Sequence, residues 1–347
     1  MGMIKLPDNS IEYFKINLDE IFETGNLAEG QWNNKLGKFV KELTDAEATI
    51  CTNSNGAGIV ALLSIYRYYF DRNIVLIQSN TMFGVKTMIP AGGCGLKGLI
   101  DCQLESLMPS ISDIKRSISR ISNNDKNKLI ILLSHIGGII NPDIKEIASL
   151  CKDENITLIE DCAHSFGATL EGNHSGLFGD AGVYSFYATK AIPVGEGGVI
   201  VTKHLELGKM ISKYSIYDRF DQKLAIGCNI RISEVQALLS YSVAKEWQSI
   251  INNKIKIANQ YIKRCAELNI DHINQYLNGQ RGNYYKFVVY NKKTPITSAM
   301  PNLKTKTSSI YDYCLCECED NITIKHACLP IWYGQEQTVT DKVLNEL

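Results

Sequence analysis

The stretch LIEDCAHSFGATLEGNHSGLFGDAGVYSFYATKAIPVGEGGVIV, residues 158–201, decides the fold of this chain. It begins with an apolar segment that reaches an acid, Asp161, and it later holds Lys190 among small and apolar residues, beside several glycines. A lysine on a solvated face usually has charged neighbours, whereas partial desolvation lowers the pKa of an amine and makes it a better nucleophile. We therefore expect a strand that presents a carboxylate in the same pocket as a reactive amine.

Apolar segments alternate with amphipathic ones on both sides of this stretch. Strands separated by helices of ten or more residues indicate a mainly parallel sheet with crossover connections. Ligands bind such sheets beyond the carboxyl ends of the strands, which is where Asp161 falls. We expect strands at 48–53, 73–79, 95–101, 128–135, 156–161, 181–187 and 197–202, and helices at 33–43, 56–70, 83–93, 110–122 and 142–155.

The pattern changes after Arg231, where the residues indicate a smaller α+β unit. A long helix is expected over 232–268, strands over 283–290 and 311–318, and a closing helix over 339–347. We divide the chain into a large domain with an N-terminal arm, residues 1–245, and a small C-terminal domain, residues 246–347. The predicted fold class is a three-layer α/β/α domain with a mainly parallel sheet, followed by a smaller α+β domain.

The composition of the 347 residues is that of a soluble globular protein, with 45% hydrophobic and 21% charged residues. Lys plus Arg number 36 against 37 Asp plus Glu, so no basic excess indicates a nucleic-acid partner. The first residues lack the pattern of a secretory signal, and the longest apolar run, 129–140, is too short to span a bilayer. We therefore expect a cytoplasmic protein without membrane or nucleic-acid partners.

The eleven cysteines are scattered along the chain, and without a secretory signal we expect free, mostly buried thiols. The densest group is CLCEC, residues 314–318, with His326 nearby. It lacks the C-x₂₋₄-C spacing of zinc sites, because alternate residues on a strand share one face but form a poor tetrahedron. We expect no metal site there.

Each further candidate site residue has a structural alternative when it is considered alone. Asp161 resembles a helix N-cap, and His164 a core histidine. Ser185 offers a hydroxyl to a phosphate, but serines are also ordinary in strands. The glycine-rich helix start at 53–58 is suited to bind an anion, although such starts are common. Phe83 is equally suited to stack on an aromatic ligand and to pack in the core.

Taken together, the motifs resemble those of one family. EDCAHSFGA, G-x-FGDAGVYSFYATK and GEGGVIVT closely resemble the DegT/StrS-type sugar aminotransferases, which depend on pyridoxal phosphate (PLP). ETGNLAEGQWNNKLGKFVKEL, GCNIRISEVQA and LPIWYGQEQTVTDKV are similar to other segments of that family, so the resemblance covers nearly the whole chain. It implies the type I PLP-dependent transferase fold and a homodimer with active sites shared between subunits.

The resemblance also implies roles for individual residues. Lys190 would form the Schiff base with the cofactor aldehyde and act as the base in proton transfer. Asp161 would keep the pyridine nitrogen protonated, with His164 beside the ring. Phe83 would stack on the ring face. The phosphate would be held by Ser185, by the backbone N–H groups of Gly56 and Ala57, and by Asn229 from the other subunit.

The resemblance implies transfer of an amino group from L-glutamate to a keto sugar, nucleotide-linked in the first instance, for a surface glycan or a secondary metabolite. Two departures leave a small or phosphorylated ketone, or a cyclitol ketone, as an alternative acceptor. Ala57 replaces the usual Thr, and the segment 213–226 is short and lacks the family's Arg-x-His-Gly signature. A catalytically silent relative is a third reading, against which the intact Lys190, Asp161 and Ser185 argue. Lys190 also argues against the dehydratase branch, which has histidine there.

Overall fold

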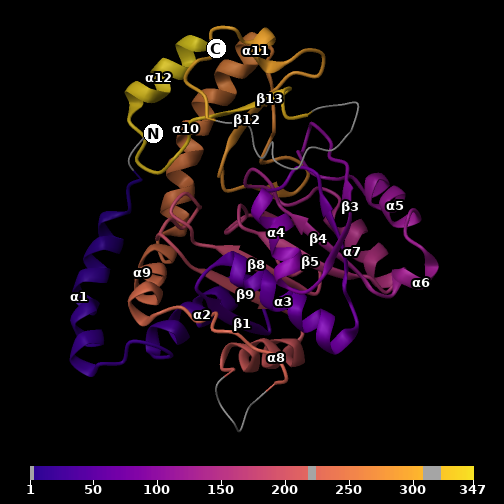
Figure 1. Cartoon of the computed structure of the whole chain (residues 1–347). Coiled ribbons are helices and arrows are strands. Elements are labelled where there is room, and N and C mark those ends of the chain that lie inside the picture. Colours follow the sequence, from indigo (N-terminus) through magenta and orange to yellow (C-terminus); the bar gives the residue numbers. More distant parts are fainter. Residues whose placement is uncertain (1–3, 218–223, 308–321) are drawn as a thin grey trace.

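The computed structural model describes residues 4–217, 224–307 and 322–347. A seven-stranded sheet lies at the centre (Figure 1). β9 runs antiparallel to both of its neighbours, and the other adjacent pairs are parallel, so the sheet is mainly parallel as predicted. The strand order is β1 (Ala48–Thr52), β9 (Gly198–Thr202), β8 (Ala181–Ser185), β5 (Thr157–Cys162), β4 (Leu129–Ser134), β2 (Ile74–Gln78) and β3 (Gly95–Ile100).

Helices cover both faces of this sheet because alternate strand residues point to opposite faces. On β5, Ile159 packs with residues of α3, α4 and α8 on one face, whereas Leu158 packs with residues of α5 and α7 on the other. The predicted three-layer α/β/α fold is therefore confirmed (Figure 1). The first face is covered by α3 (Asn55–Phe70), α4 (Phe83–Ala91) and α8 (Leu205–Ser215), and the second by α2 (Gln31–Thr44), α5 (Ile111–Ser119), α7 (Ile144–Asp153) and α9 (Glu234–Ala244), with the short α6 (Asn123–Lys126) after α5.

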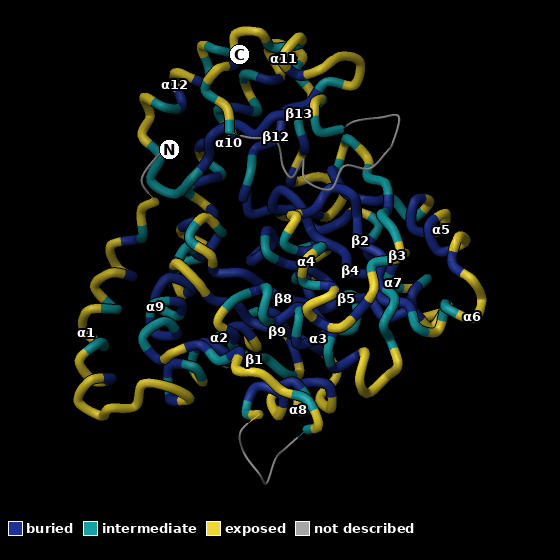
Figure 2. Tube along the Cα trace, in the orientation of Figure 1, coloured by how far each residue is buried: buried dark blue, intermediate teal, exposed yellow. Residues whose placement is uncertain are grey.

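The N-terminal arm contains a helix that the sequence analysis did not predict, α1 (Asp8–Thr24). One side of α1 contributes Tyr13 and Ile21 to the core beside α9. Elsewhere on this helix Ile16 and Phe22 are exposed, with exposed fractions of 71% and 60%. Figure 2 shows exposed residues along much of α1. Because apolar residues lie on both sides, no single apolar stripe marks this helix in the sequence.

The C-terminal part has its own antiparallel sheet, in the order β10-β12-β13. This small α+β unit agrees with expectation, although β13 was not predicted and the strand expected at 311–318 lies outside the described residues. A third small sheet has strands of two residues each, in the order β11-β6-β7. It pairs β11 of the C-terminal part with β6, which lies in the segment between β5 and β8. The elements are α10 (Trp247–Leu268), β10 (Asp271–His272), β11 (Gln280–Arg281), β12 (Phe287–Tyr290), α11 (Ile296–Ala299), β13 (His326–Leu329) and α12 (Gln337–Glu346), with β6 (Thr169–Leu170) and β7 (Asn173–His174).

The long helix expected over 232–268 is two helices, α9 and α10, separated by a turn at Lys245 and Glu246. That expectation was wrong because the apolar spacing continues through the turn without a Gly or Pro. α9 packs in one core with α1 and α2, and the start of α10, with Trp247 and Ile250, packs in the same core. The rest of α10 packs in the core of the C-terminal unit. The division into domains at 245/246 stays a prediction.

The cysteines and the helices can be compared with what the sequence predicts about disulfides and membrane spans. The cysteines in the described residues are free, and most of them are buried. No helix in the described ranges combines the length and apolar character needed to cross a membrane.

Candidate active site

The centre of the candidate site is Asp161, near the carboxyl end of β5 and only 6% exposed. Its Oδ1 accepts hydrogen bonds from Asn55 Nδ2 and from the Ala163 N–H, both at 3.1 Å. Its Oδ2 accepts one from Ser134 Oγ at 3.0 Å. A carboxylate offers about four acceptor positions, so within the described residues one position on Oδ2 is left for a further donor.

The neighbouring strand and helix orient this carboxylate. Ser134 ends β4 directly beside Asp161 in the parallel register, and its hydroxyl lies 2.9 Å from Thr81 Oγ1. Asn55 opens α3 and donates a second bond to the Val183 carbonyl at 2.7 Å, which fixes its amide. The carboxylate is thus held by side chains from β4 and α3, and Thr81 in the loop before α4 contacts the Ser134 hydroxyl in turn.

The start of α3 lies against the end of β8. Gly198 pairs with Ser185 across β9 and β8, and a Cβ at Gly198 would come within 2.8 Å of the Asn55 nitrogen. The glycine therefore permits the close approach of helix and sheet. Ser185 is buried, and its Oγ accepts a bond from the Tyr187 N–H at 3.3 Å. The Ala57 N–H donates to the N-cap hydroxyl of Ser54 at 3.1 Å.

Lys190 lies in the segment after β8, half-buried, with its Nζ 5.0 Å from the centre of the Tyr285 ring. The same ring packs on His164, with 4.1 Å between ring centroids and 32° between planes. His164 is only 3% exposed, and its Nδ1 accepts a bond from the Gly137 N–H at 3.4 Å. The Tyr285 ring therefore lies between the Lys190 amine and the His164 imidazole, and His164 follows Asp161 by three residues.

The charges around this group favour a neutral imidazole. Burial lowers the pKa of His164 well below its usual value, and the ammonium groups of Lys190 and Lys286 lower it further. For Tyr285, burial alone would raise the pKa. The two ammonium groups and interactions of the hydroxyl with Thr189 and Lys190 outweigh that effect, so the pKa is lowered overall.

Of the residues predicted from sequence, Asp161 and Ser185 lie at neighbouring strand ends, and Lys190 and His164 meet at Tyr285. Phe83 is 51% exposed at the first turn of α4, two residues after Thr81. Asn229 is exposed, and its Oδ1 accepts a bond from the Arg231 N–H at 3.1 Å. Among the described hydrogen bonds, none joins either residue to the Asp161 group.

Sequence reasoning missed four residues at this site: Asn55, Ser134, Tyr285 and Lys286. Asn55 lies inside the glycine-rich helix start, and Ser134 ends an apolar strand. Both are places where ligands bind in parallel sheets, so their positions in the sequence could have indicated a role in the site. Tyr285 and Lys286 come from the C-terminal unit, about a hundred residues after Lys190. No local pattern indicated that they would reach it.

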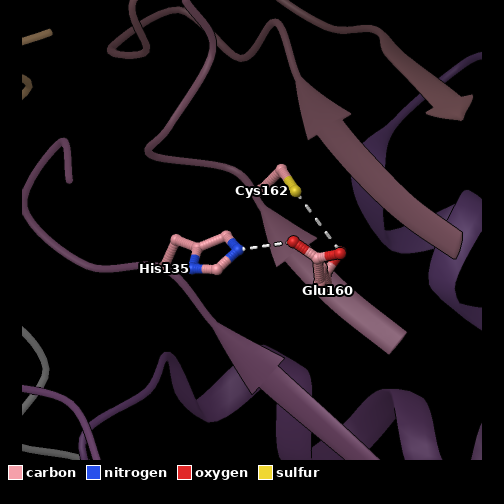
Figure 3. A group of neighbouring side chains, drawn as sticks. All are labelled: His135, Glu160 and Cys162. Carbon is pink, nitrogen blue, oxygen red and sulfur yellow. Dashed lines mark hydrogen bonds and ion pairs between the residues drawn. The ribbon is translucent and has the colours of Figure 1, made fainter. Parts of the chain in front are cut away.

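A second buried group lies on the opposite side of β5: His135, Glu160 and Cys162 (Figure 3). Glu160 accepts bonds from the N–H groups of Gly176, Phe178 and Gly179, each at 2.7 Å, and contacts His135 Nε2 at 2.8 Å. The second ring nitrogen of His135 accepts the Asn141 N–H at 3.1 Å. Because the carboxylate and imidazole lone pairs are already used, this group is a structural network and a poor metal site.

A family model, the DegT/DnrJ/EryC1/StrS aminotransferase family, matches residues 9–312 of the chain. The chain belongs to this family. Membership confirms the resemblance found in the sequence and implies an aminotransferase with pyridoxal phosphate as its cofactor. A crystal structure of a DegT/DnrJ/EryC1/StrS aminotransferase from Brucella abortus aligns over 100% of this chain and 98% of its own, with a TM-score of 0.86 at 16% identity, which supports the fold.

Two relatives of the chain are named for different compounds. GDP-perosamine synthase of Escherichia coli O157:H7 is 32% identical over 67% of this chain and 62% of its own length. A protein of Micromonospora echinospora named as a putative L-glutamine:3-amino-2,3-dideoxy-scyllo-inosose aminotransferase is 28% identical over 49% of this chain and 43% of its own. The matched region thus spans less than two thirds of either relative.

The described residues fit the cofactor of this family. The free acceptor position on the buried Asp161 suits a ring N–H donor, and Lys190 provides a primary amine. The start of α3 closely approaches Gly198 of β9, which pairs with Ser185 at the end of β8. Helix N–H groups and the Ser185 hydroxyl are a suitable donor set for a phosphate.

Proposed function

We propose that this chain is a PLP-dependent aminotransferase that moves an amino group from L-glutamate to a keto sugar. The observation that carries the proposal is the buried Asp161 carboxylate, oriented by three donors and left with one acceptor position, in a chain of this family. When bound, the cofactor supplies an aldehyde that carries the amino group and a ring that accepts electrons.

The chain's own residues then have defined tasks. Asp161 binds the protonated ring nitrogen, and Asn55 and Ser134 keep its oxygens in position. Lys190 binds the cofactor through Nζ, and that same amine takes and returns the proton at the reacting carbon. His164 packs beside the ring as a neutral imidazole, because burial and two ammonium groups lower its pKa.

The phosphate is assigned to Ser185 and to the N–H groups of Gly56 and Ala57 at the start of α3. The Ala57 N–H already donates to Ser54 Oγ at 3.1 Å, so a phosphate there shares or displaces that hydroxyl. Phe83 covers the ring face from the start of α4. The phosphate assignment rests on the dipole and the N–H groups of a helix N-terminus.

Asn229 completes the phosphate site from a second subunit, and the active form is a homodimer. Two observations support this assembly. Asn229 is exposed and, in the part of the chain that the structure describes, makes no hydrogen bond to the Asp161 group. Ile16 and Phe22 of α1 are exposed to solvent. Large apolar side chains exposed on a surface helix suit a surface that a partner covers.

A nucleotide-linked keto sugar is the first acceptor to test, since the relative from Escherichia coli is named for a GDP-sugar. A cyclitol ketone is the second candidate. It is favoured by the relative from Micromonospora echinospora, which is named for an inosose, and by the short segment 213–226.

Cofactor attachment is the first experiment. Purified apoprotein is incubated with pyridoxal phosphate, reduced with borohydride and digested, and the modified lysine is identified by mass spectrometry. We expect the label on Lys190 in wild type, none in Lys190→Ala, and normal labelling in a control variant of the exposed Lys209, Lys209→Ala. Labelling scattered over surface lysines, unchanged in Lys190→Ala, would contradict the proposal.

Substrates are assigned with the loaded protein by following the cofactor's visible absorbance. L-Glutamate should convert the bound cofactor to its aminated form, and only a true acceptor should convert it back. Parallel reactions with a nucleotide-linked keto sugar, an inosose and a phosphorylated ketone decide the acceptor class. No spectral change with any amino donor would mean that the chain is a catalytically silent relative.

A further inference from the structure

The segment 283–286 of the C-terminal unit is hydrogen-bonded to the segments that follow β4 and β5 of the large sheet. Asn283 Nδ2 donates to the carbonyls of His164 at 2.8 Å and Phe166 at 2.9 Å. The N–H groups of Asn283 and Lys286 donate to the Gly138 and Gly137 carbonyls, both at 2.9 Å. Tyr285 is therefore held in place by Asn283, two residues before it, and by Lys286, directly after it.

Gly138 makes this close approach possible. Its φ is +111°, and a Cβ there would lie 2.4 Å from Asn283 Oδ1 and 2.7 Å from the Tyr285 nitrogen. Asn283 Oδ1 in turn accepts the Tyr285 N–H at 2.7 Å. The backbone of Tyr285 thus has little freedom, and its side chain is directed into the site.

The charged and titratable groups that act on Tyr285 come from three parts of the chain. Lys190 Nζ lies 5.0 Å and Lys286 Nζ 5.3 Å from the ring centroid, and His164 packs against the ring. Ammonium groups interact favourably with the electron-rich face and oxygen of a phenol ring. Thr189, next to Lys190, also interacts with the hydroxyl.

From this geometry we propose that Tyr285 is a positioning residue for Lys190, whose Nζ is held by the phenol oxygen while the phenol ring packs on His164. The proposal rests on the proposed function, in which Lys190 binds the cofactor and moves the proton. An amine on a flexible four-carbon chain reacts faster when a fixed partner holds it near the reacting atom. Tyr285 provides that partner from outside the Lys190 segment.

The coupling can be tested in apoprotein, without cofactor or substrate. Ultraviolet absorbance follows phenol ionisation during a pH titration, and Tyr285→Phe assigns the contribution of Tyr285. We expect that contribution below pH 10, because the nearby ammonium groups outweigh burial. In Lys190→Met it should move to higher pH. A Tyr285 contribution that stays at the same pH in Lys190→Met would overturn the proposal.

The effect on Lys190 is tested by the rate at which apoprotein binds pyridoxal phosphate. Tyr285→Phe keeps the ring packed on His164 but removes the oxygen, and we expect roughly tenfold slower binding. The matched control is Tyr284→Phe, because the Tyr284 ring is stacked on Phe287 in the C-terminal core. It should bind the cofactor at the wild-type rate. Equal rates in both variants would mean that Tyr285 has only a packing role.

The two proposals fail in different ways. If wild-type protein does not bind the cofactor at Lys190, the proposed function fails, while the phenol titration still reports whether Lys190 and Tyr285 interact. If the cofactor binds and the titration shows no coupling, only the role of Tyr285 is overturned. Thermal unfolding of Tyr285→Phe, compared with Tyr284→Phe, separates a local effect from a loss of folding.

Discussion

Glu160 and Asp161 are adjacent acids on β5, and their side chains point to opposite faces of the sheet. Glu160 is fully buried, and its two oxygens accept three backbone N–H groups and contact His135. Asp161 is almost as buried, but among the described residues it accepts three bonds, two of them from side chains. Burial is therefore the same, and the difference lies in how many acceptor positions the protein fills.

This difference separates a structural acid from a binding acid. A carboxylate whose lone pairs are all used stabilises the loops that supply the donors, here residues 176–179. A carboxylate that is oriented but incompletely bonded has a position for a ligand, and leaving that position empty costs free energy. The comparison predicts that the two acids respond oppositely to substitution, Glu160 in stability and Asp161 in activity.

The largest effect is expected for Glu160→Ala, which leaves three backbone N–H groups and His135 without their acceptor. Breaking such a buried network should lower the free energy of unfolding by about 4 kcal/mol. Denaturant unfolding of the apoprotein measures this. The control is Glu154→Ala, since the Glu154 ion pair with Lys126 is partly exposed and should contribute less than about 1 kcal/mol. Equal stability of the two variants would show that the Glu160 network is not structural.

Asp161→Asn should have the converse result. The amide keeps one acceptor oxygen for Asn55 and Ala163, so the unfolding free energy should fall by only about 1 kcal/mol. Without a negative charge at the ring nitrogen, turnover should fall by about a hundredfold or more, while cofactor labelling at Lys190 persists. Turnover with L-glutamate and the accepted ketone measures this loss. A variant that retains a third of wild-type turnover would exclude Asp161 from its proposed role.

The fold was largely predictable because most strands are short apolar runs bounded by polar or glycine-containing segments. Errors arose where packing on two sides removed the pattern, as in α1, or where an uninterrupted pattern hid a turn, as at Lys245 and Glu246. The site was predictable only in part. Asp161 and Lys190 lie in one motif, whereas Tyr285 reaches them through tertiary contacts of the C-terminal unit that no local periodicity encodes.

Each of the two acids has a histidine nearby, and the one that follows Asp161, His164, predicts a dependence of stability on pH. His135 contacts the Glu160 carboxylate, whereas His164 is buried near two ammonium groups, so the pKa of His164 in the folded state lies well below its usual value. The unfolded chain, with a histidine pKa of about 6.5, therefore binds a proton that the folded protein does not as the pH falls below that value. This group lowers stability in acid.

Between pH 7.5 and pH 5.5 the contribution of His164 to this loss should be about 1.4 kcal/mol, the smallest of the three effects. His164→Gln removes it, so the unfolding free energy of the variant should fall less over that interval than that of wild type. Burial also lowers the pKa values of His174 and His326, but those residues are present in both proteins and cancel in the difference. Parallel pH profiles for the two proteins would show that His164 is charged or solvated when folded. In that case it would not pack as a neutral imidazole beside the cofactor.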